Sequence, residues 1–175
     1  MESYYYVFDM DGTLFFTDKL NNESYNFALI ERKYKPINTQ NRITREVVKN
    51  SYPEIDEQEL ARIIHKKQEY FINNISLVQK NIFLFDILNR TKKDVCILWT
   101  SAEKRRAESI VEAFTLQNFF NRIFLSVKKN ILKDIEHICL ELSCTRNNLC
   151  VFENDIFIAK ELERNNVNCF LFIRS

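Results

Sequence analysis

The chain has 175 residues, of which 46% are hydrophobic and 28% charged, and its formal net charge is +1. These values predict one folded domain with a modest insertion, and the balanced charge excludes the strongly basic field that draws proteins to nucleic acid or to anionic membranes. No apolar run is long enough to span a bilayer, and Met1-Glu2-Ser3 lacks the basic start of a signal peptide, so we expect a cytoplasmic protein.

The first predicted element is a buried strand at Tyr4–Phe8, which is followed by two carboxylates, Asp9 and Asp11, and by the only glycine, Gly12. A buried pair of like charges needs a neutralising partner, and magnesium accepts carboxylate and carbonyl oxygens. An ordinary turn is the alternative, because Asp and Gly are common turn residues. A calcium loop is disfavoured, because the residues of Thr13–Phe16 provide no further series of acidic ligands.

The segment 16–79 is longer than one crossover helix requires. Helical patterns occur at Leu20–Lys35 and at Leu60–Ile72, and Asp56 with Glu59 predicts a capping box before the second. We therefore predict a small helical insertion after the first strand.

Strand-like apolar runs and helix-like stretches alternate along the rest of the chain. The runs lack a clean polar alternation, as expected for strands that are buried on both faces of a parallel sheet. The strands are predicted at Tyr4–Phe8, Val95–Trp99, Arg122–Leu125, Leu149–Phe152 and Val167–Phe172. The later helices are predicted at Asn81–Arg90, Ala102–Phe114, Ile131–Leu142 and Asp155–Arg164. This order predicts an α/β fold with a doubly wound, parallel, Rossmann-like sheet.

Residues 1–15 and 80–175 are assigned to this α/β core, and residues 16–79 to the helical insertion. Ser101 and Asp155 have the residue types that cap helix N-termini, and each precedes a predicted helix. Most of the five cysteines lie in apolar runs without metal-type spacing, which indicates reduced core residues.

Polar side chains stand where two further predicted strands end. Thr100 follows the apolar run at Val95–Trp99, and a hydroxyl in that place can bind a phosphate oxygen in the crevice where such sheets bind ligands. Glu153 and Asp155 follow the run at Leu149–Phe152. For Asp155 the simpler alternative is a helix cap, because a cap needs the same residue type.

Phe8-Asp9-Met10-Asp11-Gly12-Thr13-Leu14 resembles the first motif of the haloacid dehalogenase superfamily, which consists mostly of magnesium-dependent phosphatases and phosphotransferases. Thr100 resembles the second motif, a hydrophobic strand that ends in Thr or Ser. The helical insertion at 16–79 is similar in position to the cap of the phosphoglycolate-phosphatase-like and β-phosphoglucomutase-like branch. The resemblance spans nearly the whole chain.

The third motif of the superfamily is a lysine near the start of the helix before the fourth strand. Lys128 and Lys129 directly follow the run at Arg122–Leu125, and Lys133 is a third candidate. We favour Lys128. The proline that usually follows this lysine in the superfamily is absent here.

The fourth motif usually carries two acids, and Glu153 and Asp155 are aligned with them across a shortened turn. The resemblance implies that Asp9, the Asp11 carbonyl, Glu153 and Asp155 hold Mg²⁺. It further implies that Asp9 attacks phosphorus, that Asp11 acts as acid and base, and that Thr100 and Lys128 bind the phosphoryl oxygens.

The expected activity is magnesium-dependent hydrolysis of a small phosphorylated metabolite through an aspartyl-phosphate. Two alternatives remain at this point: a phosphomutase with the same residues, and a binding or regulatory protein that keeps the fold but turns over weakly. The sequence leaves the substrate and the oligomeric state open.

Overall fold

The computed structural model describes residues 4–91 and 94–172. The chain divides into two compact units, of which the first comprises Met1–Phe15 with Lys80–Ser175 and the second comprises Phe16–Gln79. We call them the core unit and the helical unit. No helix in the described ranges has the length and apolar character needed to cross a membrane.

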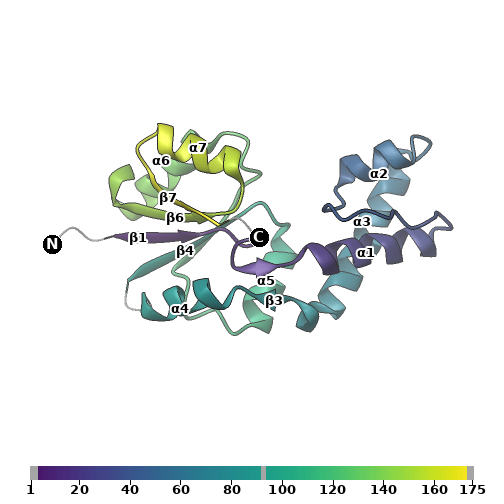
Figure 1. Cartoon of the computed structure of the whole chain (residues 1–175), viewed down its shortest axis with the longest axis horizontal. Coiled ribbons are helices and arrows are strands. Elements are labelled where there is room, and N and C mark those ends of the chain that lie inside the picture. Colours follow the sequence, from purple (N-terminus) through teal and green to yellow (C-terminus); the bar gives the residue numbers. More distant parts are fainter. Residues whose placement is uncertain (1–3, 92–93, 173–175) are drawn as a thin grey trace. The chain divides into compact units, whose positions relative to one another are not determined.

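A five-stranded parallel sheet forms the centre of the core unit, and its strand order is β5-β4-β1-β6-β7 (Figure 1). Its strands are β1 (Tyr5–Phe8), β4 (Val95–Thr100), β5 (Arg122–Leu125), β6 (Leu149–Glu153) and β7 (Asn168–Leu171). Two short strands, β2 (Phe15–Phe16) and β3 (Gln79–Lys80), pair separately. This parallel sheet with helices on its faces confirms the predicted Rossmann-like α/β class.

The helices of the core unit cover the two faces of the sheet, α6 and α7 on one and α4 and α5 on the other (Figure 1). Right-handed crossover connections require this division, because the chain moves outward from β1 through β4 to β5 and then returns to β6 and β7. The helices are α4 (Ile82–Arg90), α5 (Lys104–Ala113), α6 (Ile131–Leu142) and α7 (Ile156–Arg164), with a short 3₁₀ turn η2 (Arg146–Asn148).

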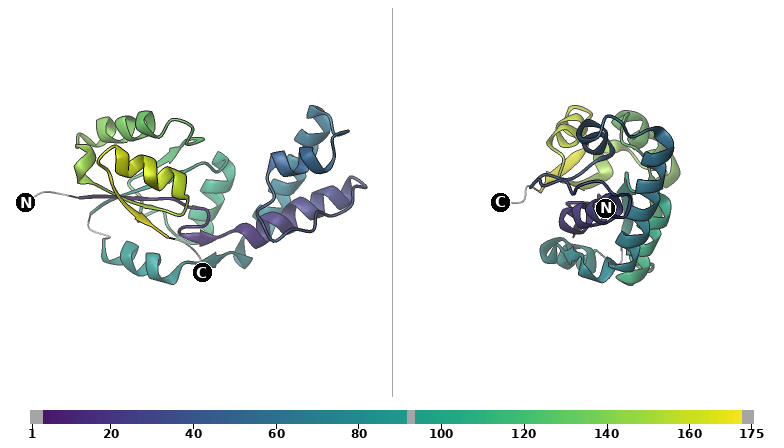
Figure 2. Two further views of the ribbon diagram at one scale, coloured as in Figure 1. Left: turned by 45° about the horizontal axis from the view of Figure 1, so that its top comes forward. Right: turned by 90° about the vertical axis from the view of Figure 1, so that its right-hand side faces the viewer.

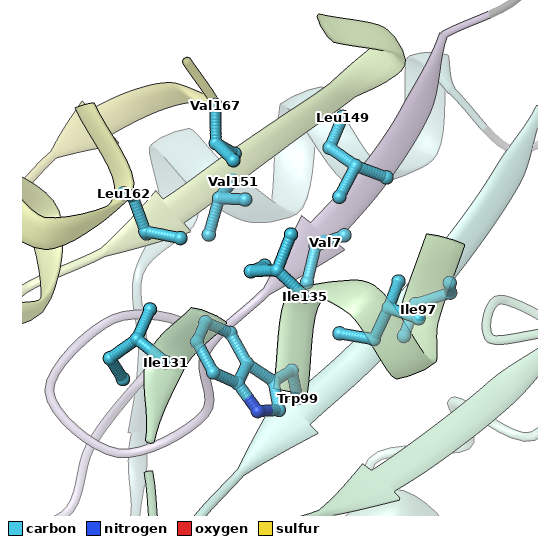
Figure 3. Packing of buried hydrophobic residues seen from close by; sticks show 10 residues of the cluster. Val7, Ile97, Trp99, Ile131, Ile135, Leu149, Val151, Leu162 and Val167 are labelled. Atoms are coloured by element: carbon cyan, nitrogen blue, oxygen red, sulfur yellow. The ribbon is translucent and has the colours of Figure 1, made fainter. Parts of the chain in front are cut away.

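Beneath α6 and α7 the sheet carries a tightly buried apolar cluster, shown in Figure 3. Val7 of β1 lies in it with Trp99 of β4, whose ring lies beside Ile131 and Ile135 of α6. These residues are at most 8% exposed. Burying aliphatic and aromatic side chains of this size contributes about 1.5–3 kcal/mol each, so this cluster anchors the strand ends that carry the polar residues.

The helical unit consists of α1 (Asp18–Glu31), α2 (Arg45–Ser51), α3 (Glu57–Asn73) and η1 (Ile75–Leu77). Within it, α1 and α3 pack against each other (Figure 2). The Asp56 side chain accepts a hydrogen bond from the backbone N–H of Glu59 and so caps α3, as its sequence predicts. The role of this unit as a cap over a substrate stays a prediction.

One predicted helix start is wrong. The helix α5 begins at Lys104 rather than at Ala102, and its N-cap is Glu103 rather than Ser101. The Glu103 carboxylate accepts hydrogen bonds from the backbone N–H groups of Arg105 and Arg106. The Glu103 carboxylate satisfies two of the donors that every helix N-terminus exposes. This explains why α5 begins two residues later than a cap at Ser101 predicts.

Candidate active site

The carboxyl ends of the parallel strands meet at one edge of the sheet, at the point where β1 lies between β4 and β6. This is the topological switch point, the place where ligands bind in open α/β sheets. Phe8 of β1 is in register with Leu98 of β4 and with Phe152 of β6. Asp9 and Glu153, which follow those two phenylalanines, therefore leave the sheet at the same level.

A lysine bridges these two carboxylates. Lys128 Nζ lies 2.7 Å from Asp9 Oδ1 and 2.7 Å from Glu153 Oε2, and all three side chains are at most 7% exposed. The same ammonium lies 4.4 Å from the centroid of the Trp99 ring. Lys128 thus forms two ion pairs and a cation–π contact in a site from which water is largely excluded.

The backbone of Lys128 adopts a left-handed conformation with φ = 52°. This conformation is unfavourable for a residue with a side chain, and it is tolerated where the surroundings fix it. A hydrogen bond of 3.1 Å from the Lys128 backbone N–H to Ser126 Oγ helps to hold the loop after β5. Of the three lysines considered from the sequence, Lys128 is the one in the cluster, whereas Lys129 and Lys133 are exposed.

Burial and charge act together on the titration of this cluster. Burial raises the pKa of Asp9 to about 7, with further upward contributions from Glu153 and Asp11, while the Lys128 ammonium opposes the rise. Burial by itself lowers the pKa of Lys128, but the charges of Asp9 and Glu153 outweigh it and leave the Lys128 pKa above its usual value. Lys128 is therefore a permanent cation in this site at neutral pH.

Asp11, the second acid of the first motif, pairs with Arg106 of α5. Arg106 Nη2 donates to Asp11 Oδ1, and both side chains are largely buried. Sequence reasoning missed Arg106 because it lies in a charged stretch of the chain. The position of Arg106 along the helix could have revealed it. Arg106 precedes the buried Ala107 and lies four residues before the buried Ile110, so it lies on the apolar face of α5.

Thr13 and Asn154 join the loop after β1 to the loop after β6. Thr13 Oγ1 donates to Asp9 Oδ2 at 2.9 Å. A hydroxyl has one proton, so its contact with the Asn154 amide at 3.1 Å has the amide nitrogen as donor. In that orientation the Asn154 nitrogen also lies 3.2 Å from the Asp11 carbonyl oxygen and 3.2 Å from Glu153 Oε1. Asn154 is a second residue that sequence reasoning missed.

Gly12 occupies a position that admits no side chain. Its φ is +85°, and a Cβ atom there would come within 2.9 Å of Asn154 Cγ. We expect Gly12→Ala to lower the free energy of unfolding by about 1–3 kcal/mol, because backbone strain and the clash act together. Urea unfolding measures this loss. The double variant Gly12→Ala/Asn154→Ala should regain the part of the stability that the clash costs, but not the part that backbone strain costs. A Gly12→Ala protein as stable as the wild type would contradict this account.

Thr100 is 1% exposed at the end of β4, and its Oγ1 accepts a hydrogen bond of 3.1 Å from the backbone N–H of Ala102. This bond shapes the turn into α5 and leaves the hydroxyl proton as a donor. Phosphate binding by Thr100 stays a prediction.

The structure does not bring Asp155 into the cluster. Its carboxylate accepts hydrogen bonds from the backbone N–H groups of Phe157 and Ile158 and so caps α7, and the residue is exposed. The residue that lies against the loop of the first motif is its neighbour Asn154. The alternative that the sequence offered for Asp155, a helix cap, describes its position.

Two substitutions at Asp155 separate a cap from a metal ligand. We expect Asp155→Ala to cost about 1 kcal/mol of stability and Asp155→Asn to cost almost none, because asparagine caps helices as well as aspartate does. Neither should change magnesium affinity in calorimetry. Weaker magnesium binding in both variants would show that Asp155 reaches the ion.

The oxygen atoms around Asn154 are of the type that magnesium binds. The Asp11 carbonyl and Glu153 Oε1 both lie 3.2 Å from one amide nitrogen, and Thr13 links that amide to the Asp9 carboxylate. Hard oxygen donors of this type suit Mg²⁺. In the part of the chain that the structure describes, no group of three or more His, Cys, Asp and Glu side chains converges as a metal site. When Asp9, Asp11 and Glu153 are all ionised, these three carboxylates face two side-chain cations, Lys128 and Arg106, and one negative charge is left for a bound cation to neutralise.

Comparison with known proteins identifies the family and the fold of the chain. A family model described as haloacid dehalogenase-like hydrolase matches residues 6–155, and no curated protein matches the chain. A predicted phosphoglycolate phosphatase from Haemophilus somnus has a TM-score of 0.79 at 14% identity, over 98% of this chain and 84% of that one. A proposed β-phosphoglucomutase from Thermotoga maritima has a TM-score of 0.73 at 20% identity, over 98% of this chain and 86% of that one.

A haloacid dehalogenase-like family hydrolase from Streptococcus pneumoniae has a TM-score of 0.77 at 11% identity, over 97% of this chain and 84% of that one. At such identities the solved structures demonstrate a common fold and nothing finer. The family match rests on the sequence itself and covers most of the chain.

Proposed function

Because the chain belongs to the haloacid dehalogenase-like hydrolase family, we propose that it is a magnesium-dependent phosphatase that acts on a small phosphorylated metabolite. The observation that carries this proposal is the buried Asp9–Lys128–Glu153 cluster at the switch point of the sheet. A carboxylate held by a buried lysine at such a place is suited to attack an electrophile and to have its charge balanced while it does so.

In the proposed reaction an Asp9 carboxylate oxygen attacks phosphorus. The new bond joins Asp9 to the phosphoryl group as the bond to the leaving oxygen breaks. Asp11, which takes up a proton from water before this step, gives that proton to the leaving oxygen. Water then attacks the phosphoryl group, Asp11 takes a proton from the water, and Asp9 is released with inorganic phosphate. Each proton that Asp11 gives in the first step is regained in the second.

The neighbours of Asp9 have separate tasks in this proposal. Lys128 holds Asp9 Oδ1 and offers its ammonium to the phosphoryl oxygens, and Thr13 holds Asp9 Oδ2. Thr100 donates its hydroxyl to a phosphoryl oxygen. Glu153 keeps Lys128 in place through the second ion pair.

Magnesium, when bound, would balance the negative charge shared by the nucleophile and the phosphate. The Asp9 carboxylate, the Asp11 carbonyl and Glu153 are the residues that would hold it. We leave Asp155 out of this set, because its carboxylate caps α7.

A phosphomutase is the second candidate, since the fold is that of the proposed β-phosphoglucomutase as well. It would use the same residues and require a bisphosphate to start the cycle.

We propose that the enzyme acts in the cytoplasm on a free metabolite.

The test is hydrolysis of p-nitrophenyl phosphate by the purified protein, with magnesium and with a chelator in its place. Turnover that needs magnesium supports the phosphatase. Conversion of a sugar monophosphate into its isomer that needs an added bisphosphate, with little release of inorganic phosphate, supports the mutase. A protein that binds magnesium or phosphate without turning over would instead be a binding protein on this fold.

A further inference from the structure

Arg106 is the charged residue of the site to which the mechanism above gives no task. Its side chain is 5% exposed, and it pairs with Asp11 across 95 positions of the sequence. A buried guanidinium needs an anionic partner. The partner here is the residue that has to exchange protons with the substrate, so the pair lies within the chemistry rather than beside it.

The arginine extends from a firmly held element. The Glu103 carboxylate accepts hydrogen bonds of 3.1 Å and 3.2 Å from the backbone N–H groups of Arg105 and Arg106, which fixes the first turn of α5. Ala107 and Ile110 of the same helix are fully buried. A side chain that starts from a capped and packed helix has little freedom, so it can impose a position on the group it binds.

Asp11 itself lies in the turn after β1, directly before Gly12. Its own side chain is 15% exposed, more than that of Arg106. The arginine is therefore the more deeply buried member of the pair, and the carboxylate is the more accessible to water. This arrangement suits a carboxylate that is held from behind and presented to a ligand.

We propose that Arg106 is the positioning residue for Asp11. The ion pair fixes the direction from which the Asp11 carboxylate meets first the leaving oxygen and then the attacking water. This inference rests on the proposed function and adds to it a residue outside the four motifs. Misplacing a catalytic group by about 1 Å can cost on the order of 100-fold in rate, so the loss of this contact should be large in kcat.

The test compares two aryl phosphates whose leaving groups differ in their need for a proton, phenyl phosphate and 2,4-dinitrophenyl phosphate. In Arg106→Met, we expect kcat on phenyl phosphate to fall roughly 10- to 100-fold, with KM changed less than about twofold. On the dinitrophenyl ester the first step needs no proton, so phosphorylated Asp9 should accumulate. Acid quenching and mass spectrometry would detect the added phosphoryl group.

Three further variants keep the result specific. Arg105→Met removes the exposed neighbouring arginine on the same turn and should behave as the wild type. Arg106→Lys keeps a cation and should recover part of the kcat. Asp11→Asn combined with Arg106→Met should be no slower than Asp11→Asn alone, because residues that act through one another do not add. Thermal melting establishes that each variant is folded.

Several outcomes would overturn the inference. Equal losses on both esters without phosphorylated Asp9 would reduce Arg106 to a structural residue. A raised KM with an unchanged kcat would make it a binding residue for the substrate's own charge. Inactivity of the wild type and of Arg105→Met on both esters would refute the proposed function and the role of Arg106 with it. An active wild type with an equally active Arg106→Met would refute the role alone.

Discussion

Asp9→Asn should abolish turnover of any phosphate ester, with kcat reduced by roughly 1,000-fold or more. An amide oxygen is a poor nucleophile, and the side chain otherwise keeps its size and its place beside Lys128 and Thr13. The measurement is release of inorganic phosphate under saturating substrate and magnesium. Acid-quenched wild-type protein should also carry a phosphoryl group that the variant lacks.

The control is Asp86→Asn on α4, which removes a carboxylate that is 56% exposed and pairs with Arg90 on the surface. We expect it to keep full activity. The two variants should melt close to the wild type, since Asp9→Asn removes a charge that burial already disfavours. More than a tenth of wild-type activity in Asp9→Asn would assign the nucleophile to another residue.

Lys128→Met should destabilise the protein by about 3–5 kcal/mol, because it leaves two buried carboxylates without their common partner. Urea unfolding at pH 7 measures this change. Lys129→Met, which alters the exposed neighbour, should stay within about 0.5 kcal/mol of the wild type. Equal stability of the two variants would show that the ion pairs contribute nothing.

The pH dependence of Lys128→Met has a definite sign. Loss of the ammonium raises the Asp9 pKa further, so the folded state binds a proton more tightly than the unfolded state does. The contribution of Asp9 to stability is fully present below its unfolded-state pKa and is lost as the pH rises through the folded-state pKa. Because the pKa of Asp9 in the folded wild type is already about 7, the deficit of the variant against wild type should widen above pH 7 and change little below it. Adding Glu153→Gln should restore part of the loss at pH 7, because one of the two facing charges is then gone.

The fold could be predicted from the sequence because buried parallel strands leave a strong apolar signal. The run at Arg122–Leu125 has the bounds of β5, and the pattern at Ile131–Leu142 has those of α6. The N-terminus of α5 was harder, because serine and glutamate both cap helices and only the path of the backbone decides between Ser101 and Glu103.

The candidate site divides in a similar way. Asp9, Lys128 and Glu153 follow strand ends, so topology alone brings them to one edge of the sheet. Arg106 and Asn154 could not be found in that manner. Arg106 contacts Asp11 from the first turn of α5, 95 positions away in the sequence, and no local sequence pattern predicts a contact at that separation. Asp155 and Asn154 are adjacent, and the direction in which each side chain points depends on where α7 begins.

Trp99, described above as part of the buried cluster, is the only tryptophan of the chain. Because the Lys128 ammonium lies 4.4 Å from its ring centroid, we expect the emission of Trp99 to respond to occupancy of the site, without any attached dye. An anion that draws the ammonium toward itself changes the electric field at the indole, and so does protonation of the carboxylates. The chain thus contains its own optical probe, through which binding, titration and unfolding can each be followed in a single cuvette.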